Sequence, residues 1–265
     1  MFRLFQKSLK TGVVTTGYPF EKEEAPALFR GRLEFDGGRC DGCEACVAVC
    51  PAGAIHVSRG WWQVAYAGCV FCGRCREACA KGAIRLTGAY ELAGRKKVSM
   101  VVSGQIGAPT ISSQQVNSQQ VDPSTEILNQ KIKRILGRSL HIRHVDAGSC
   151  NGCDWEATAL LNPVYDLQRL GIDFVASPRH ADMLLVTGPV ARHMETAVLR
   201  TYEATPDPKL VVAAGACACG GGVFGGSYAV AGGVDKLLPV DVYIPGCPPR
   251  PQALIYGLLK ALDRI

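Results

Sequence analysis

Thirteen cysteines are the residues of this 265-residue sequence with the most distinctive chemistry. They fall into two groups, eight between Cys40 and Cys79 and five between Cys150 and Cys247. An odd number cannot pair completely as disulfides, and Met1–Lys7 lacks the apolar stretch of a secretory signal. Cysteine richness without export is typical of metal binding in a reducing compartment. We therefore expect these thiols to hold metal in the cytoplasm.

The first eight cysteines form an internal repeat. The spacing C-x2-C-x2-C-x3-C occurs twice, beginning at Cys40 and again at Cys69. Three close thiolates suit one 4Fe–4S cluster, and the fourth cysteine of such a run ligates the other cluster. The predicted ligands of cluster 1 are Cys40, Cys43, Cys46 and Cys79, and those of cluster 2 are Cys69, Cys72, Cys75 and Cys50. Structural zinc favours paired C-x2-C knuckles instead, so we prefer iron–sulfur.

The segment of roughly residues 30–90 resembles bacterial 2(4Fe–4S) ferredoxins through these two cysteine runs. The resemblance implies a small α+β domain, which we expect over residues 1–100 with an N-terminal extension. Gly104–Pro123 is rich in Ser, Gln and Gly and has little apolar periodicity. We interpret residues 101–137 as a linker with a connecting helix. The alternative is a long ordered loop lying on a partner.

The remaining residues, 138–265, alternate between short apolar runs and helical stretches. The predicted strands are Leu140–Val145, Ile172–Ala176, Met183–Val186, Leu210–Ala214 and Val240–Ile244. The predicted helices are Asp154–Leu161, Val164–Leu170, Arg192–Tyr202 and Gln252–Leu262. Several strands lack period-two alternation, as expected when both faces are buried. The pattern predicts a parallel α/β sheet with right-handed crossovers.

The second cysteine group follows the carboxyl ends of these strands. Cys150 and Cys153 come after the first run, Cys217 after the fourth and Cys247 after the fifth. Open α/β sheets bind ligands at that edge, so we expect four thiolates to converge on a third cluster. Cys219 is left over, either as a substitute ligand or, as we prefer, as a spare buried thiol. The nearby glycines, Gly220–Gly222, match no nucleotide-binding motif, and we expect them to wrap the cluster.

The formal charge of +6 is weak evidence for a nucleic-acid partner. Each oxidised 4Fe–4S site with its thiolates carries about −2, so three sites bring the total near zero. No dense Arg/Lys run with interleaved aromatic residues is present either. We therefore expect no nucleic-acid binding.

The second half resembles the 20-kDa cluster-bearing subunit of respiratory complex I and the related small subunits of nickel–iron hydrogenases. The motifs that carry the resemblance are Asp146–Glu156, Ser177–Asp182, Gly215–Cys217 and Val240–Pro249. It covers roughly residues 138–263 and implies a flavodoxin-like α/β domain. It also implies the ligands of the third cluster, which are Cys150, Cys153, Cys217 and Cys247. The whole chain then looks like a ferredoxin-type subunit fused to a 20-kDa-type subunit.

The spacing of the first cysteine pair separates the two families. Complex I subunits of this kind have two adjacent cysteines, whereas Cys150 and Cys153 are spaced as in the hydrogenase small subunits. Phe5–Pro19 looks like the start of the corresponding formate hydrogenlyase subunit. The resemblance therefore favours a membrane-associated hydrogenase. The alternatives are a complex-I-like quinone or ferredoxin oxidoreductase without nickel, and a zinc-stabilised interaction protein.

The resemblance implies electron relay by three 4Fe–4S clusters. A donor, either formate dehydrogenase or a ferredoxin, would exchange electrons with the first half. The third cluster would lie next to the nickel–iron site of a partner large subunit, which is similar to the 49-kDa subunit of complex I. Integral membrane subunits would hold the assembly at the inner face of the cytoplasmic membrane. The chain has no nickel ligand set of its own, so we expect a relay rather than a complete enzyme.

Three further residues have a possible role near the third cluster. Glu156 follows Cys153 by three positions and could relay protons or bond at the partner interface, or simply favour a first helical turn. Arg179 and His180 could tune the third cluster by charge, or make ordinary loop contacts.

Overall fold

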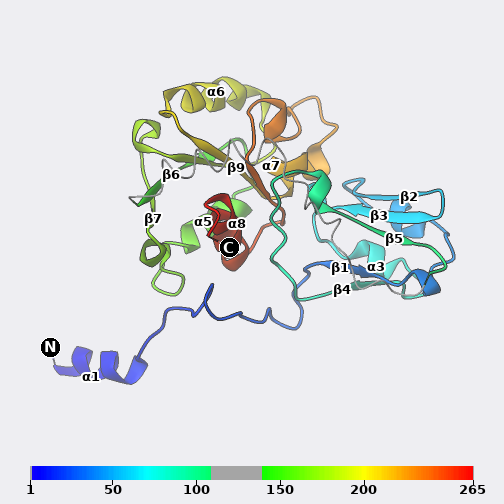
Figure 1. The fold of residues 1–265 in the computed structure, drawn as a ribbon, viewed down its shortest axis with the longest axis horizontal. Coiled ribbons are helices and arrows are strands. Elements are labelled where there is room, and N and C mark those ends of the chain that lie inside the picture. Colours follow the sequence, from blue (N-terminus) through cyan, green and yellow to red (C-terminus); the bar gives the residue numbers. More distant parts are fainter. Residues whose placement is uncertain (1, 109–138, 265) are drawn as a thin grey trace.

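The computed structural model describes residues 2–108 and 139–264, which form two halves packed side by side (Figure 1). Most of the predicted linker, residues 109–137, lies outside the described residues. In the first half, helix α1 (Phe2–Thr11) stands apart from the sheets. Among the described residues, no helix is long and apolar enough to cross a membrane.

Two small antiparallel sheets build the first half. Strand β1 (Leu33–Phe35) pairs with β4 (Ile84–Leu86), and β3 (Trp61–Ala65) lies between β2 (Ile55–Ser58) and β5 (Val101–Gln105). Two one-turn helices, α2 (Ala45–Ala48) and α3 (Arg74–Glu77), each contain the third cysteine of one run. Each cysteine run is therefore followed by a strand, which gives the α+β arrangement that the repeat predicts. The sheet extends to residue 105, five residues beyond the predicted domain boundary.

The second half contains a five-stranded parallel sheet, as predicted. Its strands are β6 (Leu140–Asp146), β7 (Ile172–Phe174), β8 (Met183–Thr187), β9 (Leu210–Ala214) and β10 (Val242–Ile244). The spatial order is β10-β9-β8-β6-β7, and every pair is parallel. Counted within this half, the order is the 2-1-3-4-5 of flavodoxin-like folds, whose switch point lies between the first and third strands. Here these are β6 and β8.

Helices cover the sheet and close its core. They are α5 (Gly152–Ala159), α6 (Glu195–Ala204), α7 (Ala216–Gly220) and α8 (Pro251–Ala261). Helix α8 is buried along nearly its whole length, and its side chains join the strands in one apolar cluster. The predicted helix Val164–Leu170 is wrong, because the structure has only a 3-10 turn, Leu167–Leu170. Asp166 takes a left-handed conformation there and interrupts the helix.

The two halves share a hydrophobic core. Trp62 and Val64 of the first half belong to the same buried cluster as Val186 and Val211 of the parallel sheet. The chain between β4 and β5 also crosses to β10, where the backbone groups of Gly94 and Tyr243 exchange two hydrogen bonds of 3.0 and 2.8 Å. This strap covers the exposed edge of the parallel sheet. The halves therefore dock directly, which fixes the positions of their cysteines relative to each other.

Candidate iron–sulfur centres

The structure brings the fourth cysteine of each run next to the triplet of the other run. Burial raises the pKa of Cys46, and the neighbouring thiols of Cys40 and Cys79 contribute to the rise. Cys43 is exposed on the loop between Cys40 and Cys46. The cysteines of each predicted set therefore come from both repeats. The two repeats pack pseudo-symmetrically, so the last cysteine of each repeat lies near the first three cysteines of the other.

The second set forms in the same way. Burial raises the pKa of Cys69 to about 12, with further contributions from Cys75, Cys50 and Cys72. Cys75 has a pKa of about 11, mainly through burial, and its neighbours include Cys46 of the first set. The two sets of thiols in the first half therefore lie close to each other.

Backbone N–H groups point at these sulfurs. Ala54 and Ala83 each stand four residues after the last cysteine of a run, and each donates to that sulfur, Cys50 or Cys79, over 3.3 Å. The indole of fully buried Trp62 lowers the pKa of Cys46, opposing the effect of burial. Within the described residues, its Nε1–H has no hydrogen-bond partner. Such N–H groups stabilise charge on sulfur and tune reduction potential.

The second cysteine group converges at the carboxyl edge of the parallel sheet. Cys150 lies on the loop after β6, Cys153 in the first turn of α5, Cys217 in α7 after β9, and Cys247 after β10. Burial raises the pKa of Cys153 to about 12, with contributions from Cys217, Cys247 and Cys150. Burial likewise raises the pKa of Cys217 to about 11, with Cys247 and Cys150 as neighbours. The four thiols therefore lie at one edge of the sheet, within electrostatic range of one another.

Cys219 differs from Cys217 in its contacts. Its thiol is completely buried and donates to the carbonyl oxygen of Ala213 over 3.3 Å. Burial raises its pKa, and Cys153 contributes to the rise. The thiol of Cys217 has Cys247 and Cys150 as electrostatic neighbours, whereas Cys219 bonds to the strand behind it.

Glycine is required where the backbone passes these sulfurs. Gly215 has a φ of +93°, and a Cβ atom there would lie 2.5 Å from the Cys153 sulfur. At Gly222, with a φ of +52°, a Cβ atom would lie 3.2 Å from the Cys217 sulfur. The glycine-rich segment therefore passes close to the thiols of Cys153 and Cys217.

We predict that Gly215→Ala displaces the Cys153 thiol. The strained backbone alone should lower the free energy of unfolding by about 1–3 kcal/mol. Because the added methyl group also occupies the position of the sulfur, the variant should lose the iron of this site. Gly226→Ala is the matched control, since a Cβ atom there meets nothing within 4 Å. Iron analysis and chemical unfolding of both variants measure the two effects, and equal iron contents would contradict the prediction.

The three groups of thiols fit 4Fe–4S clusters chemically. Each predicted set consists of four cysteines, the ligand set of these clusters. Without a counterion, burial and mutual repulsion keep the thiols of Cys69, Cys153 and Cys217 protonated, as their raised pKa values show. Iron would supply the positive charge that stabilises them as thiolates, with release of protons on binding.

The second and third groups meet where the two halves dock. Burial raises the pKa of Cys247, and Cys150 of its own group and Cys72 of the first half contribute to the rise. The same interface is tight enough that a Cβ atom on Gly220 would lie 2.7 Å from the Ala67 carbonyl oxygen. Cys72 is thus the residue of the first half that approaches the C-terminal cysteines.

The three further candidates lie in different places. Glu156 is half-buried on α5, where burial raises its pKa and Arg250 opposes the rise. Arg179 and His180 precede β8 and line a cavity of about 650 Å³ with His141 and Asp182. Residues before a parallel strand lie at its amino edge, whereas the cysteines lie at the carboxyl edge. Arg179 and His180 are therefore outside the cysteine site, and we do not propose them as tuning residues.

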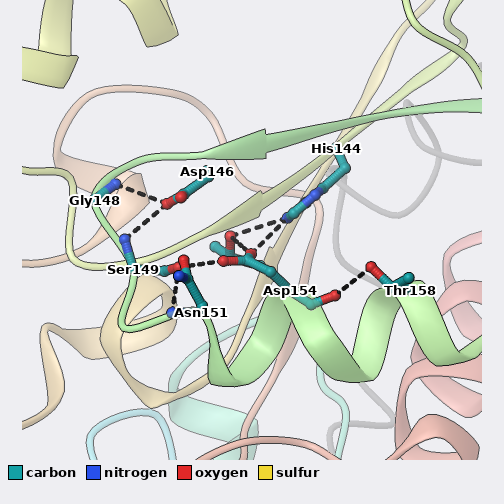
Figure 2. A network of polar contacts seen from close by, with 8 residues as sticks. His144, Asp146, Gly148, Ser149, Asn151, Asp154 and Thr158 are labelled. Atoms are coloured by element: carbon teal, nitrogen blue, oxygen red, sulfur yellow. Dashed lines mark hydrogen bonds and ion pairs between the residues drawn. The ribbon is translucent and has the colours of Figure 1, made fainter.

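One polar network beside the cysteines escaped the sequence analysis. His144, Ser149, Asp154 and Thr187 contact one another between β6, β8 and α5 (Figure 2). Ser149 and Asp154 immediately flank the segment from Cys150 to Cys153, and this position in the sequence could have indicated that they lie near the site. His144 and Thr187 had none, because their contacts with Asp154 span ten and 33 residues of sequence.

Comparison with known proteins identifies both halves. Residues 150–261 match the family NADH ubiquinone oxidoreductase, 20 Kd subunit. A probable membrane-bound hydrogenase subunit mbhJ of Pyrococcus furiosus is 52% identical over 132 residues, covering 50% of this chain and 79% of the relative. The chain belongs to this 20-kDa subunit family. Residues 32–88 match the 4Fe-4S dicluster domain. This match confirms the predicted fusion of a ferredoxin-type part to a 20-kDa-type part. The 20-kDa family member is therefore an iron–sulfur protein.

Three other proteins similar to this 20-kDa family member have different names. Formate hydrogenlyase subunit 7 of Escherichia coli is 49% identical over 142 residues, which are 54% of this chain and 56% of the relative. An NADH-quinone oxidoreductase subunit of Citrifermentans bemidjiense is 55% identical over 113 residues, which are 43% of this chain and 66% of the relative. A chain in the structure of an archaeal membrane-bound sulfane sulfur reductase matches with 37% identity and a TM-score of 0.43, covering 54% of this chain and 75% of that one.

Proposed function

We propose that this chain is an electron-relay subunit with three 4Fe–4S clusters in a membrane-associated nickel–iron hydrogenase. The observation that carries the proposal is the succession of three four-cysteine groups in one rigidly docked chain. The proposed ligands are Cys40, Cys43, Cys46 and Cys79 for cluster 1, Cys69, Cys72, Cys75 and Cys50 for cluster 2, and Cys150, Cys153, Cys217 and Cys247 for cluster 3. The clusters supply one-electron chemistry, and the chain supplies their spacing, orientation and electrostatics.

The contacts between the groups give the relay its order. Cys46 of the first group neighbours Cys75 of the second, and Cys72 of the second neighbours Cys247 of the third. Electrons from a donor, a formate dehydrogenase or a ferredoxin, would therefore pass through cluster 2 before they reach the second half. The apolar core that the two halves share supports this route, because it holds the halves directly against each other.

An exposed surface beside the third group suits a partner subunit. Cys150 and Cys247 are exposed, and Trp155, next to Cys153 on α5, keeps 75% of its surface accessible. Leu161 and Val164 add exposed apolar surface just after α5. Apolar side chains gathered on one surface are typical of protein–protein contacts. We propose that the large subunit, similar to the 49-kDa subunit of complex I, docks here and receives electrons at its nickel–iron site.

The hydrogenase reading is favoured over a complex-I-like oxidoreductase without nickel. Cys150 and Cys153 are spaced, which is the hydrogenase pattern of the resemblance. The hydrogenase and hydrogenlyase relatives also match over 132 and 142 residues, against 113 for the quinone oxidoreductase relative. We place the chain on the inner face of the cytoplasmic membrane, held there by integral membrane partners.

Anaerobic purification of the native complex through a tag on this chain tests the proposal. We expect nickel to copurify with a partner of large-subunit size, together with about twelve irons per copy of this chain. The same iron content without nickel would favour the quinone or ferredoxin oxidoreductase. Zinc in place of iron would contradict both functions.

A further inference from the structure

The loop that presents two thiols of the third group is folded around one serine. It connects β6 to α5 (Figure 2). Asp146 Oδ1 accepts hydrogen bonds from the backbone N–H groups of Gly148 and Ser149, over 2.9 and 2.7 Å. The hydroxyl of Ser149 accepts a further bond of 3.0 Å from the Asn151 N–H. Because Cys150 lies between Ser149 and Asn151, these bonds determine where its backbone runs.

Asp154 ties this loop to the parallel sheet. Its Oδ2 accepts a hydrogen bond from the Ser149 hydroxyl. Its Oδ1 accepts one of 2.7 Å from the Thr187 hydroxyl at the end of β8, and lies 2.9 Å from His144 Nε2 on β6. Figure 2 shows Asp154 between Ser149 and His144. An ionised carboxylate accepts only, so all three neighbours point their hydrogens at it.

The network carries a negative charge close to the third group. The side chain of Asp154 is only 19% exposed, and that of His144 only 25%. Burial lowers the pKa of His144 despite the nearby carboxylates of Asp154 and Asp146. Burial thus disfavours the charged form of the imidazole that lies beside the Asp154 carboxylate. In a poorly solvated position, a charge acts on its surroundings more strongly than it would in water.

We propose that Asp154 is the positioning residue of the third cluster and that its charge lowers the reduction potential of that cluster. The inference rests on the proposed function, because it requires a cluster at Cys150, Cys153, Cys217 and Cys247. Asp154 directly follows Cys153 and holds the residue that precedes Cys150, so one side chain fixes both thiols of the pair. A negative charge nearby disfavours addition of an electron, which makes the cluster harder to reduce.

Two substitutions at Asp154 separate position from charge. Asp154→Ala removes the acceptor for three donors, of which Thr187 is fully buried, and frees the loop. The full chain should therefore lose about four of its about twelve irons. Asp154→Asn can still accept at one oxygen, and its amide can donate to the Ser149 hydroxyl. It should therefore keep its iron, while the midpoint potential of the third cluster, followed by electron paramagnetic resonance (EPR) during redox titration, shifts to more positive values.

A buried carboxylate at the other edge of the sheet provides the control. Asp182 is 5% exposed and accepts a 3.0 Å hydrogen bond from the His141 N–H, before β8. Asp182→Ala should lower stability without selective loss of the third cluster. The inference would be overturned if Asp154→Ala kept its full iron content or lost all three clusters. It would also be overturned if Asp154→Asn left the midpoint potential of the third cluster unchanged. A wild-type chain with only about eight irons would instead contradict the proposed function, and the inference with it.

Discussion

Replacing Cys217 by alanine is expected to remove the third cluster and leave the other two intact. The thiol of Cys217 lies beside those of Cys247 and Cys150, and the first half holds its own eight cysteines. The iron content of the anaerobically isolated chain should therefore fall from about twelve to about eight. In the complex, electrons from the donor should no longer reach the large subunit, so donor-linked turnover should drop to background.

Cys219→Ala is the matched control for this prediction. It removes a thiol two residues away in the same helix, but one that bonds to Ala213 behind the site. We expect the iron content to stay at about twelve, with a modest loss of stability from the vacated volume. If Cys219→Ala lost the third cluster and Cys217→Ala kept it, the ligand assignment in α7 would be wrong.

The second large effect is expected from Cys50→Ala, which should remove cluster 2 although Cys50 belongs to the first repeat. Cys50 neighbours the Cys69 and Cys75 thiols, so its loss leaves that group with three ligands. Cluster 1 should remain, because it takes its fourth ligand from Cys79. Since cluster 2 connects the halves, the third cluster should then no longer be reduced by the donor.

Cys79→Ala is the control, because it should remove cluster 1 and leave cluster 2 in place. Both variants should hold about eight irons, but they should differ in magnetic coupling. Because Cys72 lies beside Cys247, we expect cluster 2 to split the EPR signal of the third cluster. The splitting should persist in Cys79→Ala and vanish in Cys50→Ala. The opposite pattern would show that each run of four cysteines holds its own cluster.

The sequence was most informative where chemistry follows local spacing. The two cysteine runs predicted the exchange of Cys50 and Cys79, and in the structure each of these thiols interacts electrostatically with cysteines of the other run. The convergence of Cys150, Cys217 and Cys247 followed from their positions after strands, because the carboxyl ends of parallel strands meet at one edge. Their role as ligands stays a prediction that the variants above test.

Other features depend on contacts without a local signature. The pairing of Gly94 with Tyr243 joins segments far apart in sequence, and neither segment has a sequence pattern that predicts it. The contact between His144 and Asp154 likewise appears only when α5 packs on β6. Arg179 precedes β8 and therefore lies at the amino edge of the sheet, which agrees with the ordinary loop contacts that the sequence left open for it.

The central claim is that one chain carries three 4Fe–4S clusters in series. The most direct test is to measure iron, acid-labile sulfide and EPR signals on the same anaerobic sample of the intact chain during stepwise reduction. The account predicts about twelve irons and about twelve sulfides per chain, with three interacting signals of reduced 4Fe–4S clusters. About eight irons, with Cys150, Cys153, Cys217 and Cys247 open to alkylation, would contradict it.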